Sequence, residues 1–469
     1  MIDHGVGDLP KVSAQALKAG VDMDMVGEGF LLTLQQSLKE GKITQQDIDQ
    51  ACRRILEAKY KLGLFEDPFR YIQPERVDRD IYTAENRAVA RKTAASSLVL
   101  LKNENSILPL KKSGTIALVG PLADNAVNMV GTWAVAADSK NAISVKKGLG
   151  EVGGSNIQWK YAHGSNLHDD SSFNVRASMF GKTVKWDRRD AQAMIEEALA
   201  IAKESDVIVA AVGESAEMSG ESSSRTDIRI PESQRRLLDA LVKTGKPVVA
   251  LVFSGRPLEL SWESKHIPSI LHVWFPGSEA GYAIADVVFG DVNPSGKLTS
   301  TFPQHVGQIP IFYNHKMTGR PQDPNKWFTK FKSNYLDVNN EPLYPFGYGL
   351  SYTKFEYGKP RLNKTSISSN ETIEVSVDIT NTGSRAGEEV VQLYIRDVVG
   401  SVSRPVKELK GFQKLNFEAG EKKTVTFKIG INDLKFYNAN LEFVAEPGEF
   451  HVMVGPNSKD VQTISFKLK

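Results

Sequence analysis

Cysteine is almost absent from this chain: Cys52 is the single one among 469 residues. One thiol cannot form an intrachain disulfide, and it cannot supply the several thiolates of a structural zinc site or an iron–sulfur cluster. Cys52 falls within a predicted amphipathic helix, so we expect it to be a small buried side chain without chemistry of its own.

Long apolar runs and a charge excess are also missing. No stretch approaches the roughly 20 apolar residues that a membrane span needs, so no membrane partner is expected. Lysine and arginine number 58 against 56 acidic residues, and this near balance does not indicate a nucleic-acid-binding protein. The eight histidines include no pair at i and i+4 beside an acid, which leaves a metal site without support. His272 lies within an apolar run and is interpreted as a hydrogen-bonded core histidine.

The first 65 residues predict helices around one short strand. Apolar and acidic residues alternate over 21–26, which is typical of a strand. Thr44 and Asp47 have the spacing of a helix N-cap and its capping partner. These elements are too few to bury a core of their own. We therefore interpret residues 1–65 as the last part of a larger domain. Residues 66–97 are interpreted as a charged linker followed by a helix from about residue 84 to residue 97.

From residue 98 the pattern changes to strands and helices in alternation. Apolar runs rich in β-branched residues predict strands at 115–119, 157–161, 207–212, 247–253 and 270–274. Amphipathic segments at 190–203 and 232–243 predict helices between them. This alternation predicts an α/β sandwich domain with a mostly parallel sheet over residues 98–318.

The last third of the chain has a different period. Residues 319–357 form a polar, aromatic-rich connection that includes Trp327 and Phe328, and connections of this length are usually functional or disordered. From residue 372 apolar and polar residues alternate in several runs separated by turn signals. This period of two predicts an antiparallel β-sandwich over residues 358–469.

A loop rich in carboxylates follows the strand predicted at 207–212. It carries Glu214, Glu217, Glu221, Arg225 and Asp227 among glycines and serines. Ligands of open α/β sheets bind beyond the carboxyl ends of the parallel strands, so the loop is a candidate site. Hydrolysis of a glycosidic bond needs two carboxyl groups, and neighbours on one loop seldom reach opposite faces of a sugar ring. A partner acid would come from another segment. From composition alone, a solvated surface loop is the commoner alternative.

Several short stretches spread over the whole chain look like the motifs of one family. They are residues 19–25 (AGVDMDM), 97–103 (SLVLLKN), 119–124 (VGPLAD), 221–227 (ESSSRTD), 290–297 (GDVNPSGK), 344–352 (YPFGYGLSY) and 404–407 (RPVK). With them the chain resembles glycoside hydrolase family 3, and its bacterial periplasmic β-glucosidases in particular.

The resemblance implies a (β/α)8-type barrel, an α/β sandwich domain and a fibronectin type III-like domain. Residues 1–65 would then be the carboxyl-terminal remnant of the barrel. The implied activity is retaining hydrolysis of terminal β-D-glucosyl units from β-glucosides or gluco-oligosaccharides, without a metal or an organic cofactor. The implied location is periplasmic or otherwise extracytoplasmic, although no signal peptide opens the chain.

By motif, the family's general acid/base falls on Glu221. Arg225 and Asp227 would hold and polarise the loop that carries it. Glu214 and Glu217 are interpreted as flanking, solvated acids.

The family's nucleophile is an aspartate at the end of a barrel strand, upstream of the 19–25 motif. The sequence around Asp3 matches part of the motif that carries this nucleophile. Asp3 nevertheless lies too close to Gly20 and follows no apolar strand, so it is interpreted as a loop residue. We therefore expect the nucleophile to precede Met1, which leaves the activity of the chain alone open. The missing barrel portion would be supplied in trans, or a homo-oligomer would form.

Two further expectations concern binding. Trp327 and Phe328 would border the leaving-group side by stacking on sugar rings, with packing between domains as an equal alternative. A non-catalytic fragment that binds sugar, or acts as an interaction module, is the alternative to the enzyme as a whole.

Overall fold

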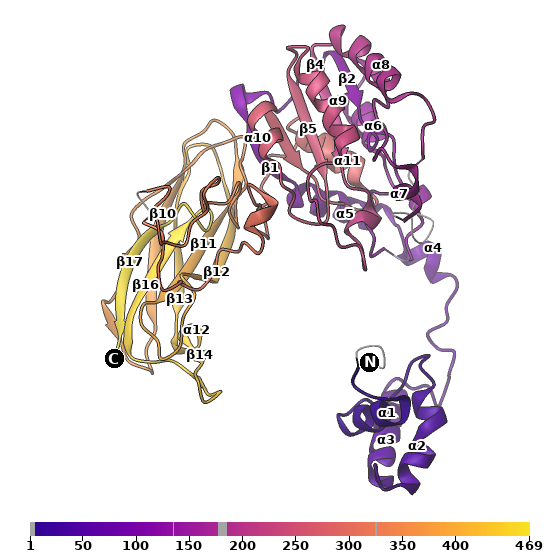
Figure 1. Cartoon of the computed structure of the whole chain (residues 1–469), viewed down its shortest axis with the longest axis vertical. Coiled ribbons are helices and arrows are strands. Elements are labelled where there is room, and N and C mark those ends of the chain that lie inside the picture. The colour runs from indigo at the N-terminus through magenta and orange to yellow at the C-terminus, as the bar shows by residue number, and fades with distance from the viewer. Residues whose placement is uncertain (1–4, 135, 177–184, 324–325) are drawn as a thin grey trace. The chain divides into compact units, whose positions relative to one another are not determined.

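The computed structural model of this chain describes residues 5–134, 136–176, 185–323 and 326–469. The chain separates into two compact units, Met1–Thr83 and Ala84–Lys469 (Figure 1). The finer domain boundaries expected from the sequence stay predictions.

The first unit is helical. Its helices are α1 (Leu9–Lys18), α2 (Gly29–Lys39), α3 (Gln45–Lys61) and α4 (Arg76–Asp80). The predicted capping box begins α3: the Asp47 amide donates to Thr44 Oγ1 at 3.2 Å, and the Thr44 amide donates to Asp47 Oδ2 at 2.8 Å. The core is a small cluster of Ala14, Leu17, Ile43 and Ala51, and Val12 is a further buried apolar side chain.

Two expectations about this unit are wrong. Residues 21–26 have an irregular backbone instead of a strand. A strand needs a neighbour to pair with, and within residues 5–83 no other strand forms. Cys52 is exposed, not buried. The apolar stripe of α3 is wider than this small unit can cover, so burial reaches Ala51 but not Cys52.

Exposed apolar side chains on the first unit predict self-association. Met25, Leu31, Tyr60 and Phe65 are all exposed, although each is large and apolar. We expect the apparent mass in light scattering to rise with protein concentration. The variant Leu31→Lys/Tyr60→Lys should stay at the mass of one chain. The matched control Val399→Lys, at an exposed apolar site of the second unit, should leave the association unchanged. A wild-type chain that remains monomeric at every concentration would contradict this prediction.

The second unit begins with α5 (Ala84–Ser97) and then builds a six-stranded sheet. Its strands are β1 (Val99–Asn103), β2 (Gly114–Val119), β3 (Ile157–Ala162), β4 (Val207–Gly213), β5 (Val248–Phe253) and β6 (Ser269–His272). The spatial order is β1-β6-β5-β4-β2-β3. All neighbours pair in parallel except β1, which runs antiparallel to β6. The mostly parallel sheet predicted from the sequence is confirmed.

Helices cover both faces of this sheet, and each face has its own core (Figure 1). The helices are α6 (Val145–Gly153), α7 (Ser171–Arg176), α8 (Ala191–Lys203), α9 (Glu232–Val242), α10 (Ser261–His266) and α11 (Ala280–Val288). Side chains of α5, α6 and α11 join one core, and those of α8 and α9 join the other. Successive residues of β4 alternate between the two: Val209 packs in the first core and Ile208 in the second. Burial on both faces explains why the strand sequences read as continuous apolar runs.

The end of the second unit is the predicted β-sandwich. Its longer strands are β10 (Ile373–Asn381), β11 (Gly387–Asp397), β12 (Glu408–Phe417), β13 (Lys422–Ile429), β16 (Gly448–Gly455) and β17 (Gln462–Leu468). Shorter elements are β7 (Phe355–Tyr357), β8 (Arg361–Leu362), β9 (Ser366–Ile367), α12 (Ile431–Leu434), β14 (Phe436–Tyr437) and β15 (Phe443–Val444). One sheet has the order β13-β10-β7, with β8 also on β10, and the other β12-β11-β16-β17-β9. The apolar residues that alternate along these strands meet in one core between the sheets.

Candidate active site

The carboxylate loop begins where β4 ends, at the carboxyl edge of the parallel sheet. Gly213 has φ +124°, and a Cβ there would lie 2.1 Å from the carbonyl oxygen of Phe253 on β5. Gln234 of α9 holds the same residue from the other side: its Oε1 accepts from the Gly213 amide at 2.8 Å and its Nε2 donates to the Gly213 carbonyl at 2.9 Å. The exit of the chain into the loop is therefore fixed by backbone contacts and one buried amide.

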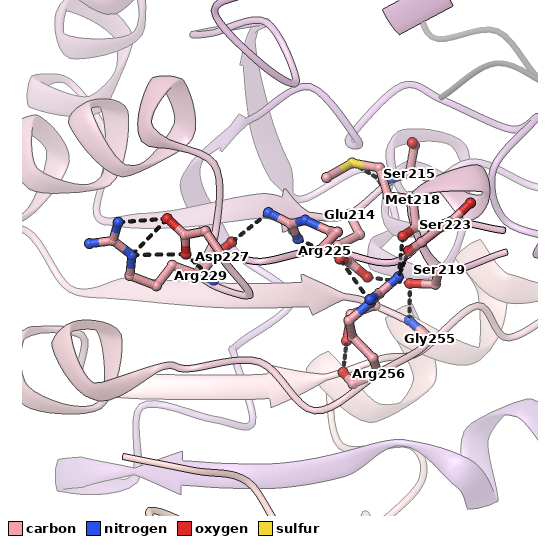
Figure 2. A network of polar contacts seen from close by, with 12 residues as sticks. Glu214, Ser215, Met218, Ser219, Ser223, Arg225, Asp227, Arg229, Gly255 and Arg256 are labelled. Atoms are coloured by element: carbon pink, nitrogen blue, oxygen red, sulfur yellow. Dashed lines mark hydrogen bonds and ion pairs between the residues drawn. The ribbon is translucent and has the colours of Figure 1, made fainter. Parts of the chain in front are cut away.

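Glu214 is the buried anchor of the loop, with 0% of its surface exposed. Arg225 Nη1 donates to its Oε1 at 2.5 Å, and Arg256 Nε lies 3.3 Å from the same oxygen. The Ser219 hydroxyl donates to Oε2 (Figure 2). The expectation of a solvated acid is wrong here. A buried carboxylate is tolerated because two guanidinium groups and a hydroxyl replace its water.

Glu217 is buried as well, with 4% exposed, and the expectation of a solvated acid is wrong for it too. Thr132 Oγ1 donates to Glu217 Oε1 at 2.7 Å. This contact ties the carboxylate loop to the segment that follows β2. A local sequence pattern does not reveal it, because the two residues lie on different loops of the sheet edge.

Glu221 is the one loop glutamate with an exposed side chain. The backbone on both sides of it is held: Ser223 Oγ donates to the Glu217 carbonyl at 2.7 Å, and Arg256 Nη2 donates to the Ser223 carbonyl at 2.7 Å and to the Met218 carbonyl. A ligand from solvent can thus reach Glu221 and neither of its two neighbours. Its carboxyl group is presented from a loop whose ends do not move freely.

Arg225 and Asp227 lie at the base of the loop, as Figure 2 shows. Besides Glu214, Arg225 binds the Arg229 carbonyl, through Nη2 at 3.2 Å. Asp227 Oδ2 accepts from Arg229 Nη2 at 2.6 Å, and these side-chain hydrogen bonds lower the pKa of Asp227 to about 2. Both residues hold the loop. Among the hydrogen bonds and ion pairs of the described residues, none joins either side chain to Glu221.

A pocket of 450 Å³ opens beside this loop. Its lining includes Thr132, Trp133, Ser219, Gly255, Trp274 and Phe275. Trp133 exposes 72% of its surface. This pocket was not among the expected sites. The available signal was that Trp274 ends the strand predicted at 270–274, at the same sheet edge as the loop.

Trp327 and Phe328, the aromatic residues singled out in the sequence, expose 55% and 41% of their surface. They lie in the irregular connection after residue 318 and are not part of the lining of the pocket. Both expectations for these rings, stacking on sugar and packing between domains, therefore stay predictions.

His272 is the last residue of β6, and its ring lies next to the ring of Trp274. Its ring is fully buried and meets the Trp274 ring edge to face at 4.1 Å and the Phe302 ring at 5.3 Å. Neither ring nitrogen has a hydrogen-bond partner among the described residues, so the expected hydrogen bond is wrong. Burial lowers the pKa of His272 to about 3.

His272 therefore predicts a loss of stability in acid. Below pH 6.5 an unfolded chain binds a proton that the folded chain excludes, so stability falls as the pH drops from about 6.5 towards about 3. We expect His272→Phe to be more stable than the wild type at pH 5, by about 2 kcal/mol, with a smaller gain at pH 8. Urea unfolding at both pH values measures this. His266→Phe, at an exposed histidine, is the control, and an unchanged pH dependence in His272→Phe would refute the assignment.

Across residues 5–134, 136–176, 185–323 and 326–469, no group of three or more His, Cys, Asp or Glu side chains is placed to hold a metal ion. In the same ranges, no helix has both the length and the apolar character needed to cross a membrane.

Comparison with known proteins identifies two regions. Residues 98–352 match the glycosyl hydrolase family 3 C-terminal domain, and residues 389–458 match a fibronectin type III-like domain. The first match alone covers more than half of the chain. The chain belongs to glycosyl hydrolase family 3. The predicted resemblance and the predicted fibronectin type III-like domain are confirmed.

The relatives include proteins named after two different substrates, β-glucosides and β-xylosides. The chain is 46% identical to a periplasmic beta-glucosidase of Salmonella typhimurium over 100% of its own length and 62% of the relative's. It is 40% identical to a beta-xylosidase of Formosa agariphila, over 97% of this chain and 61% of that one. A crystal structure of the beta-glucosidase of Listeria innocua in complex with isofagomine has a TM-score of 0.90 and 40% identity, covering 100% of this chain and 62% of that chain. That protein has also been solved with glucose, and a mutant of it with laminaribiose. The chain thus spans less than two thirds of the length of these relatives.

Proposed function

We propose that this chain is the carboxyl-terminal portion of a family 3 β-glucosidase that removes terminal β-D-glucosyl units with retention of configuration. The substrates are β-glucosides or gluco-oligosaccharides, and the location is periplasmic or otherwise extracytoplasmic. Support comes from the names of the Salmonella and Listeria relatives and from the glucose and laminaribiose bound to the latter. No cofactor is part of the proposal.

Glu221 is the general acid/base in this proposal. It protonates the leaving oxygen in the first step and deprotonates the attacking water in the second. The observation that carries this assignment is that Glu221 alone of the three loop glutamates is exposed, on a loop anchored by Glu214. Arg225 and Asp227 act by keeping that loop in place, not by touching the substrate.

The nucleophile is not assigned to a described residue. In the proposal it is an aspartate of the barrel portion that these 469 residues do not include, and residues 1–65 are the remnant of that barrel. The exposed apolar side chains of the first unit support this role, since barrel helices bury such surfaces against the sheet. Asp3 lies outside the described residues, and it stays interpreted as a loop aspartate.

The leaving-group side of the site is built from aromatic rings. Trp133 borders the pocket beside the carboxylate loop with most of its ring exposed, and Trp274 forms part of the same wall. Trp327 and Phe328 also present exposed rings, which leaves them available for stacking on the sugar beyond the scissile bond.

The proposal is tested by assaying the chain alone and an amino-terminally extended chain, each with a chromogenic β-glucoside and β-xyloside. We expect the extended chain to hydrolyse the β-glucoside and the chain alone to be at least a thousandfold slower, since loss of a nucleophile removes the covalent step. Full activity of the chain alone would refute the external nucleophile. Preference for the β-xyloside would refute the glucosyl assignment. If the extended chain binds glucose or cellobiose in calorimetry without hydrolysing either substrate, the non-catalytic module is correct instead.

A further inference from the structure

A second pocket lies on the β-sandwich part of the second unit, and it shares no lining residue with the pocket beside the carboxylate loop. Its volume is 530 Å³, within the usual range for small-molecule sites of about 300–1,000 Å³. Its floor is the outer face of the sheet that contains β11, β16 and β17. Arg396 and His451 are cross-strand neighbours there, as are Met453 and Thr463. Segments 311–315 and 340–345 form walls over this floor.

The pocket is strongly cationic. Arg396, Lys407 and Lys459 line it, and Glu341 is the one carboxylate among the lining residues. Lys459 Nζ pairs with Glu341 at 2.9 Å, so that carboxylate is already neutralised. The charges of Arg396 and Lys407 are left facing the space. His315 and His451 also line the pocket.

The two surplus cations have weak partners. Lys407 Nζ donates to the Ser458 carbonyl at 2.6 Å, which engages one of the three protons of an ammonium group. Arg396 Nη2 donates to the sulfur of Met317 at 3.0 Å, and a thioether is a weak acceptor. Burial lowers the pKa of Lys407, because its charge is desolvated. An anion placed between them would make charge-assisted hydrogen bonds with both.

An aromatic wall stands beside these cations. Phe312 exposes 47% of its surface and lines the pocket together with Tyr313. The Tyr313 ring is fixed, because it stacks on Phe346 at 4.4 Å and meets Tyr394 edge to face at 5.6 Å. A flat apolar surface next to two donors suits a ligand with one acidic group and one ring.

We propose that this pocket binds an acidic sugar, whose ring lies along Phe312 and whose carboxylate or phosphate lies between Lys407 and Arg396. Such a site is separate from the hydrolytic site of the proposed function. It would allow a product or a neighbouring saccharide that carries a charge to bind the enzyme without occupying the reaction centre.

The test is calorimetric titration of the full 469-residue chain with D-glucuronate, glucose 6-phosphate, inorganic phosphate and D-glucose. We expect at least one acidic sugar to bind about tenfold or more tightly than phosphate, and Lys407→Met to weaken that binding about tenfold or more. Arg396→Gln is the second variant if Lys407→Met does not fold. Lys428→Met, an exposed lysine of the same β-sandwich, and Trp133→Ala in the other pocket should leave the binding unchanged. Any heat measured on titration with D-glucose should be the same in Lys407→Met as in the wild type.

Which acidic sugar binds more tightly distinguishes a carboxylate from a phosphate ligand. Equal affinity for phosphate and both sugars would overturn the role of the ring and leave a plain anion site. Loss of binding in Trp133→Ala but not in Lys407→Met would place the ligand in the other pocket and overturn the proposal. Absence of binding by all the acidic probes at millimolar concentration would overturn it as well.

Discussion

Replacing Glu221 with alanine is expected to lower the hydrolysis of an unactivated β-glucoside by about 10³-fold in the amino-terminally extended enzyme, within the range typical of a lost general acid. An alkyl leaving group departs as a strong base and needs a proton in the transition state. A dinitrophenyl leaving group needs none, so its release should be slowed far less in the first step. Initial rates of Glu221→Ala on the two substrates measure this difference.

The control is Glu232→Ala, since Glu232 is an exposed acid at the start of α9 with no place in the proposed site. It should keep wild-type rates on both substrates. Equal losses on the alkyl and the dinitrophenyl substrate in Glu221→Ala would remove Glu221 from the acid role. It would then have to act in binding or in holding the loop.

Replacing Glu214 with alanine is expected to destabilise the second unit by about 3–5 kcal/mol, the usual cost of removing one partner of a buried ion pair. Arg225 and Arg256 both direct their charge at this carboxylate, and they would be left uncompensated beside Ser219. The effect should appear in urea unfolding of the chain as a lower midpoint at unchanged slope. The extended enzyme should also lose activity, because the loop that carries Glu221 loses its anchor.

Asp227→Asn is the matched comparison for Glu214→Ala. Asp227 also accepts from an arginine, Arg229, but both side chains of this pair are more than half exposed. Water screens such a pair, so the expected cost is below about 1 kcal/mol. A Glu214 variant that is no less stable than Asp227→Asn would contradict the role of Glu214 as the buried anchor.

Fold prediction from the sequence succeeded where the period of apolar residues reports burial directly. The helix expected at 84–97 is observed as α5, with the expected bounds. The strands of the parallel sheet are observed as well, because strands such as β5 are buried on both faces and therefore have apolar sequences. The β-sandwich was equally visible, since residues such as Val375 and Val377 alternate with solvent-facing neighbours. Residues 21–26 show the limit. Alternation alone does not make a strand when no neighbouring strand is present to accept its hydrogen bonds.

For the carboxylate loop, too, some features follow from the sequence and others only from the tertiary structure. The order of residues along the chain determined that a strand ends close to Val212 and that the 221–227 motif follows at the ligand-binding edge, while the acid role of Glu221 is a proposal that rests on the motif. Only the tertiary structure decided that Glu214 and Glu217 are buried, that Arg256 and Thr132 hold them, and that His272 lacks a hydrogen-bond partner among the described residues. The physical reason is that the charge and burial of a loop residue depend on groups brought from other loops. No local pattern encodes those distances, whereas strand and helix periods are local and can be read in the chain itself.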